Sequence, residues 1–296
     1  EIANLNPLTN RIQKCIVRNF SAKAAVEIAL YDLFGQLYGA PLYRLLGGGD
    51  NVITTDITIS VDYIDKMVAD AREAVDNGFE TLKVKVGKDP ALDIERIKAI
   101  FAAVGDRALV RLDANQGWTP KQAVSVLREL EDSGVRLELV EQPVVGEDIE
   151  GMKYVTDRVH TPVMADESSF GPREAIELIT GRAADIINIK LMKTGGLSNA
   201  VRIADISGVY GIECMIGCML ESSIGVAAAA LAIEPNQVHS RALPCTAQRF
   251  RVGNGRRLRP KPPGFHEWPH GRVKRTVGCL PDGVRALERE AHRRPQ

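Results

Sequence analysis

TLKVKVG at residues 81–87 and VRLDANQGW at residues 110–118 are two apolar, strand-like stretches that each carry charged side chains near their ends. The pattern recurs in LELVEQP, PVMADES and DIINIKLMKTGG, at residues 137–143, 162–168 and 185–196. Amphipathic helical segments separate the stretches. Nearly continuous apolar strands that alternate with helices are typical of a parallel sheet buried on both faces.

The alternation extends in both directions from these stretches. Strands are predicted at 53–60, 81–87, 108–113, 137–142, 162–166, 185–191 and 212–218. Helices are predicted near 62–76, 93–103, 119–132, 148–158, 172–181, 198–208 and 222–233. Thr119 and Gln122 fit a capping box, and Pro120 occupies the first helical position of its helix. Seven such units predict a TIM-type (β/α)7β barrel, although the eighth strand is not obvious. A doubly wound open sheet is the alternative, disfavoured because no strand leads into a glycine-rich dinucleotide fingerprint.

The two ends of the chain differ from this middle part, which we place at residues 51–240. Residues 1–50 contain the helical stretch SAKAAVEIALYDLFGQLYG, in which Ala25, Ile28, Ala29 and Leu33 can line one face. Residues 241–296 hold twelve arginines and seven prolines and show no sustained period of 2 or 3.6. We therefore predict an irregular Arg/Pro-rich tail.

Composition excludes several classes of function. Lys+Arg and Asp+Glu are equal at 38 each, so no overall charge attracts nucleic acid or an acidic membrane surface. The N-terminal residues lack the apolar core of a signal peptide, and no apolar run has the length of a membrane span. The five scattered cysteines, including Cys214 and Cys218, are interpreted as free thiols in a reducing cytoplasm, with core packing favoured over a metal site.

Five charged residues follow one another at the spacing of one β/α unit. The intervals from Lys85 to Asp113, Glu141, Asp166 and Lys190 are 28, 28, 25 and 24 residues. We therefore expect all five side chains at one level on neighbouring strands. A single carboxylate at a strand end is usually a helix cap or a surface ion pair, but three that converge repel each other. A hard divalent cation resolves the repulsion, Mg²⁺ first and Mn²⁺ second.

The two outer lysines lie on strands that face each other across a barrel. Lys85 and Lys190 can therefore approach a substrate from opposite faces, as a two-base inversion of a stereocentre requires. A metal would stabilise the enolate electrostatically. Lys83, two residues before Lys85, is expected to help the cation lower the pKa of Lys85 toward neutrality.

The motifs KxK, DANQGW, EQP, ADES and NIKLMKTGG occur here in the order and spacing of the muconate-lactonizing subgroup of the enolase superfamily, which this chain resembles. AKAAVEIALYDLFGQLYGAPLYRLLGG at 22–48 resembles the helical part of that superfamily's α+β capping domain. CMLESSIG at 218–225 also matches. The resemblance covers about residues 1–236 and is closest to the dipeptide (L-Ala-D/L-Glu) epimerases.

The resemblance implies Mg²⁺-dependent epimerisation of a dipeptide by 1,1-proton transfer at the α-carbon, through a metal-stabilised enolate. Asp166 is preferred over Glu167 as a ligand because adjacent strand residues face opposite ways. The implied site residues are the metal ligands Asp113, Glu141 and Asp166, the acid/base pair Lys85 and Lys190 with Lys83 assisting, and Glu221 on the substrate.

Two departures leave alternatives open. The chain starts within the helical part of the capping domain, so we expect a fragment with a partial cap. An Asp-x-Asp motif, which in dipeptide epimerases pairs with the substrate ammonium, is missing after IEPNQVHSRALP at 233–244. The alternatives are o-succinylbenzoate synthase, N-acylamino acid racemase or muconate cycloisomerase activity, or an inactive truncated relic. The expected partners are a dipeptide or N-acyl amino acid and further copies of the chain in a homo-oligomer.

Overall fold

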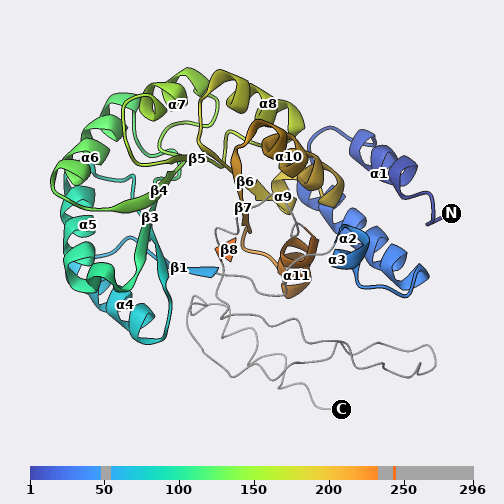
Figure 1. Cartoon of the computed structure of the whole chain (residues 1–296), viewed down its shortest axis with the longest axis horizontal. Coiled ribbons are helices and arrows are strands. Elements are labelled where there is room, and N and C mark those ends of the chain that lie inside the picture. Colours follow the sequence, from blue (N-terminus) through green and yellow to red (C-terminus); the bar gives the residue numbers. More distant parts are fainter. Residues whose placement is uncertain (48–54, 233–242, 245–296) are drawn as a thin grey trace, which may run out of the picture. The chain divides into compact units, whose positions relative to one another are not determined.

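The strands form one parallel sheet in the order β7-β6-β5-β4-β3-β2-β1-β8 (Figure 1). The computed structural model describes residues 1–47, 55–232 and 243–244. Every strand pairs in parallel with its neighbours in the sheet. The strands are β1 (Thr55–Ile59), β2 (Thr81–Lys85), β3 (Leu109–Asp113), β4 (Leu137–Glu141), β5 (Val163–Ala165), β6 (Ile186–Lys190), β7 (Glu213–Gly217) and β8 (Leu243–Pro244).

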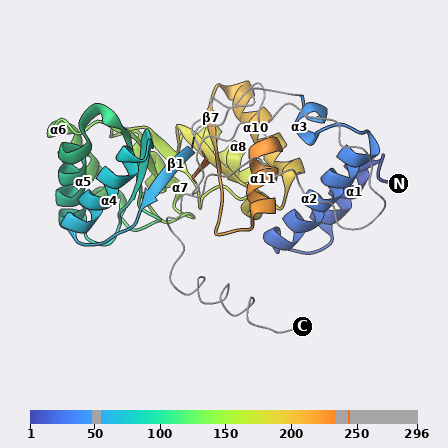
Figure 2. The same cartoon turned by 90° about the horizontal axis from the view of Figure 1, so that it is seen from below.

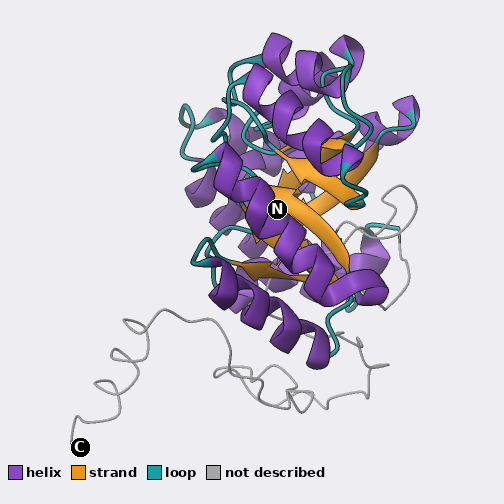
Figure 3. Ribbon diagram, turned by 90° about the vertical axis from the view of Figure 1, so that its left-hand side faces the viewer, coloured by secondary structure: helices purple, strands orange, loops and turns teal. Residues whose placement is uncertain are grey.

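Helices follow the strands and lie outside the curled sheet (Figures 1 and 3). They are α4 (Ile64–Asp76), α5 (Pro90–Val104), η1 (Gly105–Arg107), α6 (Pro120–Asp132), α7 (Ile149–Thr156), α8 (Pro172–Gly181), α9 (Leu191–Thr194), α10 (Leu197–Tyr210) and α11 (Ser223–Ala232). The predicted capping box of α6 is present, with both hydrogen bonds between Thr119 and Gln122. The predicted TIM-type barrel fold is confirmed.

The eighth strand, which the sequence did not make obvious, is short among the described residues. Leu243 and Pro244 pair with Thr55 and Asp56 of β1, and β8 also lies against β7. The barrel sheet therefore returns toward its first strand. Apart from β8, the predicted Arg/Pro-rich tail at 241–296 lies outside the described residues, and the three predicted domain ranges stay predictions.

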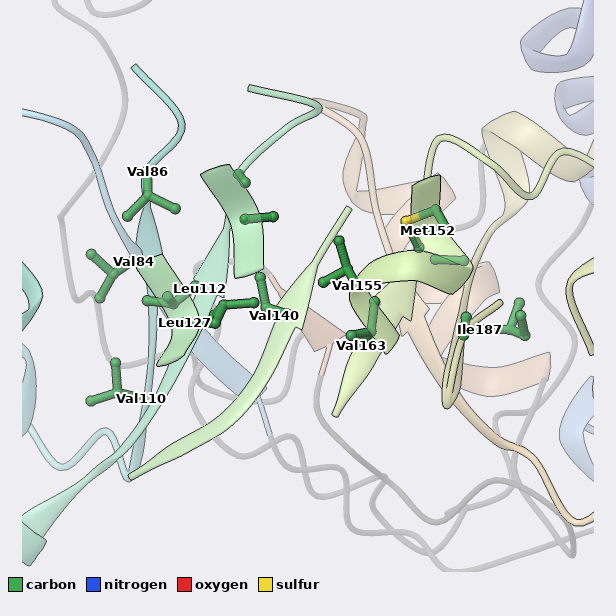
Figure 4. Close-up of a cluster of buried hydrophobic side chains, with 14 of the residues drawn as sticks. Val84, Val86, Val110, Leu112, Leu127, Val140, Met152, Val155, Val163 and Ile187 are labelled. Atoms are coloured by element: carbon green, nitrogen blue, oxygen red, sulfur yellow. The ribbon is translucent and has the colours of Figure 1, made fainter. Parts of the chain in front are cut away.

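Strand alternation gives the sheet two different faces. The outward side chains are apolar and pack against the helices in one large cluster, in which Val140 of β4 lies beside Val155 of α7 and Val84 of β2 lies beside Leu112 of β3 (Figure 4). The inward side chains form a second, small apolar cluster from β4 to β7, made of Leu139, Met164, Ile186 and Met215. Charged residues occupy the inward positions nearer the carboxyl ends of the strands.

Three helices precede the sheet: α1 (Leu5–Lys14), α2 (Phe20–Leu37) and α3 (Leu42–Leu45). Figure 2 shows α1 and α2 on the side of the sheet away from α4 and α5, and α2 packs against α9 and α10. None of the helices among residues 1–47 and 55–232 combines the length and the apolar character that crossing a membrane requires.

The apolar residues expected to line one face of α2 do not form its buried face. Ala25, Ala29 and Leu33 are exposed and Ile28 is half-buried, whereas the buried face includes Lys23 and Glu27. Hydrogen bonds satisfy these two polar residues on the buried face. Lys23 donates to the carbonyl oxygen of Gln13 at 2.9 Å, and Glu27 accepts from α10, so both polar residues turn inward.

Candidate active site

The five charged residues predicted at one level do lie close together. The pairing register of the strands, however, does not place them in a single row across the sheet. Lys85 is in register with Asp113, and Asp113 with Glu141. Glu141 is in register with Met164 and Met164 with Ile186, so Asp166 and Lys190 lie two and four residues beyond that row. The stagger between tilted barrel strands compensates for this offset, because the ion pairs below join all five residues.

Two lysines of β2 bind the first two carboxylates. Lys83 Nζ lies 2.8 Å from Asp113 Oδ2 and also pairs with Glu141 Oε2. Lys85 Nζ lies 2.6 Å from the same Asp113 oxygen. Asp113 and Glu141 are thus joined through one buried ammonium group.

Two further lysines bind Asp166 from the other side. Lys190 Nζ lies 2.5 Å from Asp166 Oδ2 and 3.9 Å from Glu141 Oε1. Lys193 Nζ lies 2.5 Å from Asp166 Oδ1 and also donates to the carbonyl oxygen of Asn188 at 3.1 Å. The row of carboxylates on β3 to β5 is therefore flanked by lysines of β2 at one end and of β6 and α9 at the other.

Burial decides the electrostatics of this cluster. Asp113, Glu141 and Asp166 are at most 2% exposed. Burial, together with the carboxylates of Asp113 and Asp166, raises the pKa of Glu141 to about 7 against the opposing charge of Lys83. Burial favours the neutral amine of Lys190, but the carboxylates of Asp166 and Glu141 outweigh it and raise the pKa. The carboxylates thus hold Lys190 in its charged form, whereas burial favours the neutral form of Glu141.

The donor set fits a hard divalent cation. Among residues 1–47, 55–232 and 243–244, no three His, Cys, Asp or Glu side chains are already arranged around a metal position, because lysines contact the carboxylates instead. Asp113, Glu141 and Asp166 nevertheless offer only oxygen atoms, are buried, and are connected through shared ammonium groups. All-carboxylate sets of this kind suit Mg²⁺.

Several polar residues at the site were missed by the sequence reasoning. Asn188 donates to Glu141 Oε1 at 2.8 Å, and its position two residues before Lys190 on one strand was a usable signal. Lys193 had no such signal, because the short helix α9 returns its side chain to Asp166. Asn115 accepts from Lys85 Nζ at 2.6 Å from the loop after β3.

Gln142, the residue after β4, organises the next loop. Its Oε1 accepts from the backbone N–H groups of Asp166, at 2.9 Å, and Ser168, at 3.1 Å. Its Nε2 donates to the carbonyl oxygen of Val144 at 2.9 Å and to Ser168 Oγ at 2.8 Å. The glutamine of the EQP motif therefore fixes the turn that presents Asp166.

Glu221 lies in the loop between β7 and α11, where its Oε1 accepts from the backbone N–H of Met219 at 3.0 Å. A Cβ atom at Gly225 would come within 2.1 Å of the other carboxylate oxygen of Glu221, so the side chain is turned toward the first turn of α11. The predicted contact between Glu221 and a substrate stays a prediction.

Comparison with known families accounts for both parts of the described structure. Residues 66–265 match the family model described as enolase C-terminal domain-like, and residues 1–47 match the mandelate racemase / muconate lactonizing enzyme N-terminal domain. The chain belongs to the enolase superfamily. The predicted resemblance is thereby confirmed at the level of the superfamily.

Relatives within the superfamily are named as dipeptide epimerases. This enolase-superfamily chain is 55% identical over 229 residues to the L-Ala-D/L-Glu epimerase of Clostridium acetobutylicum, covering 77% of the chain and 64% of that enzyme. It is 54% identical over 211 residues to the hydrophobic dipeptide epimerase of Enterococcus faecalis, covering 71% and 59%. The chain thus spans less than two thirds of the length of either relative.

A solved structure of a dipeptide epimerase is also similar to this chain. The dipeptide epimerase of Enterococcus faecalis V583, complexed with Mg and the dipeptide L-Leu-L-Tyr, superposes with a TM-score of 0.78 at 48% identity, covering 81% of this chain and 68% of that one.

Proposed function

We propose that this enolase-superfamily protein catalyses Mg²⁺-dependent epimerisation of a dipeptide by two-base 1,1-proton transfer at the α-carbon. The observation that carries the proposal is the position of Lys85 and Lys190 at opposite ends of the carboxylate row. The names of relatives that are 54–55% identical support the substrate class. The alternative superfamily activities have no comparable support.

One lysine removes the α-proton and the other delivers a proton to the opposite face. In one direction Lys85, as the neutral amine, takes the α-proton, and Lys190, as the ammonium ion, delivers a proton to the opposite face. In the reverse direction the roles exchange, so the enzyme returns to its starting protonation state only after the reverse turnover or after proton exchange with solvent. Lysine is suited to both roles because its environment can tune its pKa.

Asp113, Glu141 and Asp166 would hold the metal ion. A bound Mg²⁺ would stabilise the negative charge that develops on the substrate carboxylate when the α-proton leaves. Lys83, buried between Asp113 and Glu141, would assist Lys85 electrostatically.

The finer assignments belong to the same proposal. The dipeptide is of the L-Ala-D/L-Glu type, Mn²⁺ can replace Mg²⁺, and the protein acts in the cytoplasm as a homo-oligomer. Glu221 contacts the substrate.

The test is isotope exchange. L-Ala-L-Glu is incubated with the protein and Mg²⁺ in D₂O, and ¹H NMR and chiral chromatography follow α-deuteration of the glutamate and formation of the D-Glu epimer. Lys85→Ala and Lys190→Ala should each abolish epimerisation. Absence of exchange with every dipeptide in a panel that includes L-Leu-L-Tyr would reject the proposal for a folded, Mg²⁺-binding protein.

A further inference from the structure

Lys85 is the less constrained of the two lysines proposed to transfer protons. Its side chain is 30% exposed, whereas that of Lys190 is 9% exposed and lies against Asp166. A half-exposed lysine has a flexible four-carbon stem, and aiming it at one carbon atom costs conformational entropy. Asp113 accepts from Lys85, but the same carboxylate is proposed to bind the metal. Another group is therefore needed to hold the Lys85 ammonium.

Asn115 supplies that group. Its Oδ1 accepts from Lys85 Nζ at 2.6 Å. Its own backbone is in the left-handed region, with φ of 42°, and its N–H donates to Asp113 Oδ1 at 3.0 Å. The following residue, Gln116, donates its N–H to the carbonyl oxygen of Gln142 at 2.9 Å. The loop that carries Asn115 is thus tied to the loop after β4.

A neighbouring carboxylate selects the orientation of the Asn115 amide. Asn115 Nδ2 donates to Glu167 Oε1 at 3.2 Å. A carboxylate can only accept and an ammonium can only donate, so the amide satisfies both neighbours with Nδ2 toward Glu167 and Oδ1 toward Lys85. Rotating the amide by 180° would place donor against donor and acceptor against acceptor.

We propose that Asn115, oriented by Glu167, is a positioning residue that fixes the Lys85 ammonium on its face of the substrate. The inference rests on the proposed epimerase function and deepens it. It gives Glu167, which lies in the loop after β5, a part in the site beside Asp166. It also predicts an effect on one direction of the reaction only, since Lys85 removes the α-proton from only one of the two epimers.

The test compares α-proton exchange from the two epimers separately. Lys85→Ala first identifies the epimer whose exchange depends on Lys85. Asn115→Gly, which tolerates the left-handed backbone, and Glu167→Ala should slow that exchange by about 10-fold to 100-fold and leave exchange from the other epimer at the wild-type rate. Glu167→Gln retains an acceptor oxygen and should restore the rate. Arg182→Gly, at an exposed left-handed position (φ 53°) after α8, is the matched control.

Each outcome decides the inference. Equal slowing of exchange from both epimers would overturn the inference, because a general disturbance of the fold or of metal binding acts on both directions. Unchanged exchange from both epimers would overturn it as well, because Asn115 and Glu167 would then not position Lys85. If wild-type protein binds Mg²⁺ but exchanges neither epimer, the proposed function fails, and acetylation of Lys85 measured by mass spectrometry then decides the positioning. Faster acetylation in Asn115→Gly and Glu167→Ala than in wild type and Glu167→Gln supports it; equal rates overturn it.

Discussion

Replacing Gln142 by leucine tests how strongly the site depends on one buried amide. The side chain is fully buried and makes five hydrogen bonds, two as acceptor from backbone N–H groups and three as donor, of which the weakest goes to Met152 Sδ at 3.6 Å. Leucine has a similar volume, so the cavity term is small. The replacement therefore isolates the loss of hydrogen bonding around the turn that presents Asp166.

The expected loss can be summed from the groups left behind. The buried N–H groups of Asp166 and Ser168 lose their acceptor, at about 1–3 kcal/mol each, while the Val144 carbonyl and the Ser168 hydroxyl lose one donor. We expect the free energy of unfolding to fall by about 4 kcal/mol. For a chain of this size, that corresponds to a fall in Tm of about 8–16 °C.

Urea unfolding followed by circular dichroism measures the change, with Gln36→Leu as the control. Gln36 is exposed and its side chain donates a hydrogen bond to Asp32 within the same helix, so its replacement should cost under about 0.5 kcal/mol. The Mg²⁺-induced rise in Tm should also shrink in Gln142→Leu, because Asp166 loses its backbone anchor. A Gln142→Leu protein within about 1 kcal/mol of wild type would refute the reasoning.

Three further outcomes are expected. A thermal shift assay should show a Mg²⁺-induced rise in Tm for wild type and none for Asp113→Asn, because the variant loses a charged metal ligand. Glu27→Leu leaves the Ser198 N–H and hydroxyl without their acceptor at the start of α10, so urea titration should find it about 2–4 kcal/mol less stable. Gly117→Ala would place a Cβ atom 2.2 Å from a backbone oxygen, so its Tm should fall, whereas Gly181→Ala, where a Cβ atom meets nothing within 4 Å, should not lower it.

The barrel and the charged row could be predicted because both depend on short-range periodicity. Alternation along a strand places Lys83, Lys85 and Asp113 on the inward face, and the constant length of a β/α unit repeats that placement on the next strand. The strand register departs from this simple repeat. A spacing of one β/α unit predicted a single row, whereas Asp166 and Lys190 lie two and four residues beyond that row in register, and the stagger of the strands compensates for the offset.

Contacts between distant segments could not be predicted in this way. Positive φ angles of 78° and 128° account for the glycines at positions 195 and 196, between α9 and α10. The structure adds a second reason: a Cβ atom at Gly196 would lie 2.4 Å from Glu27 Oε2, so the glycine also makes room for the carboxylate of α2. No local pattern pairs these two positions, which are separated by most of the sheet.

The proposed catalytic residues follow from short-range periodicity, whereas the residues that position them depend on contacts between distant segments. Strand residues such as Lys85 can be recognised by spacing, since their direction follows from the backbone period. Asn115 and Glu167 lie in loops after two non-adjacent strands, and the direction of each side chain depends on a partner in another loop. Sequence periodicity therefore predicts which groups meet at a barrel end, whereas the loops decide at which angle they meet, and the angle is what a proton transfer to one face of a carbon atom requires.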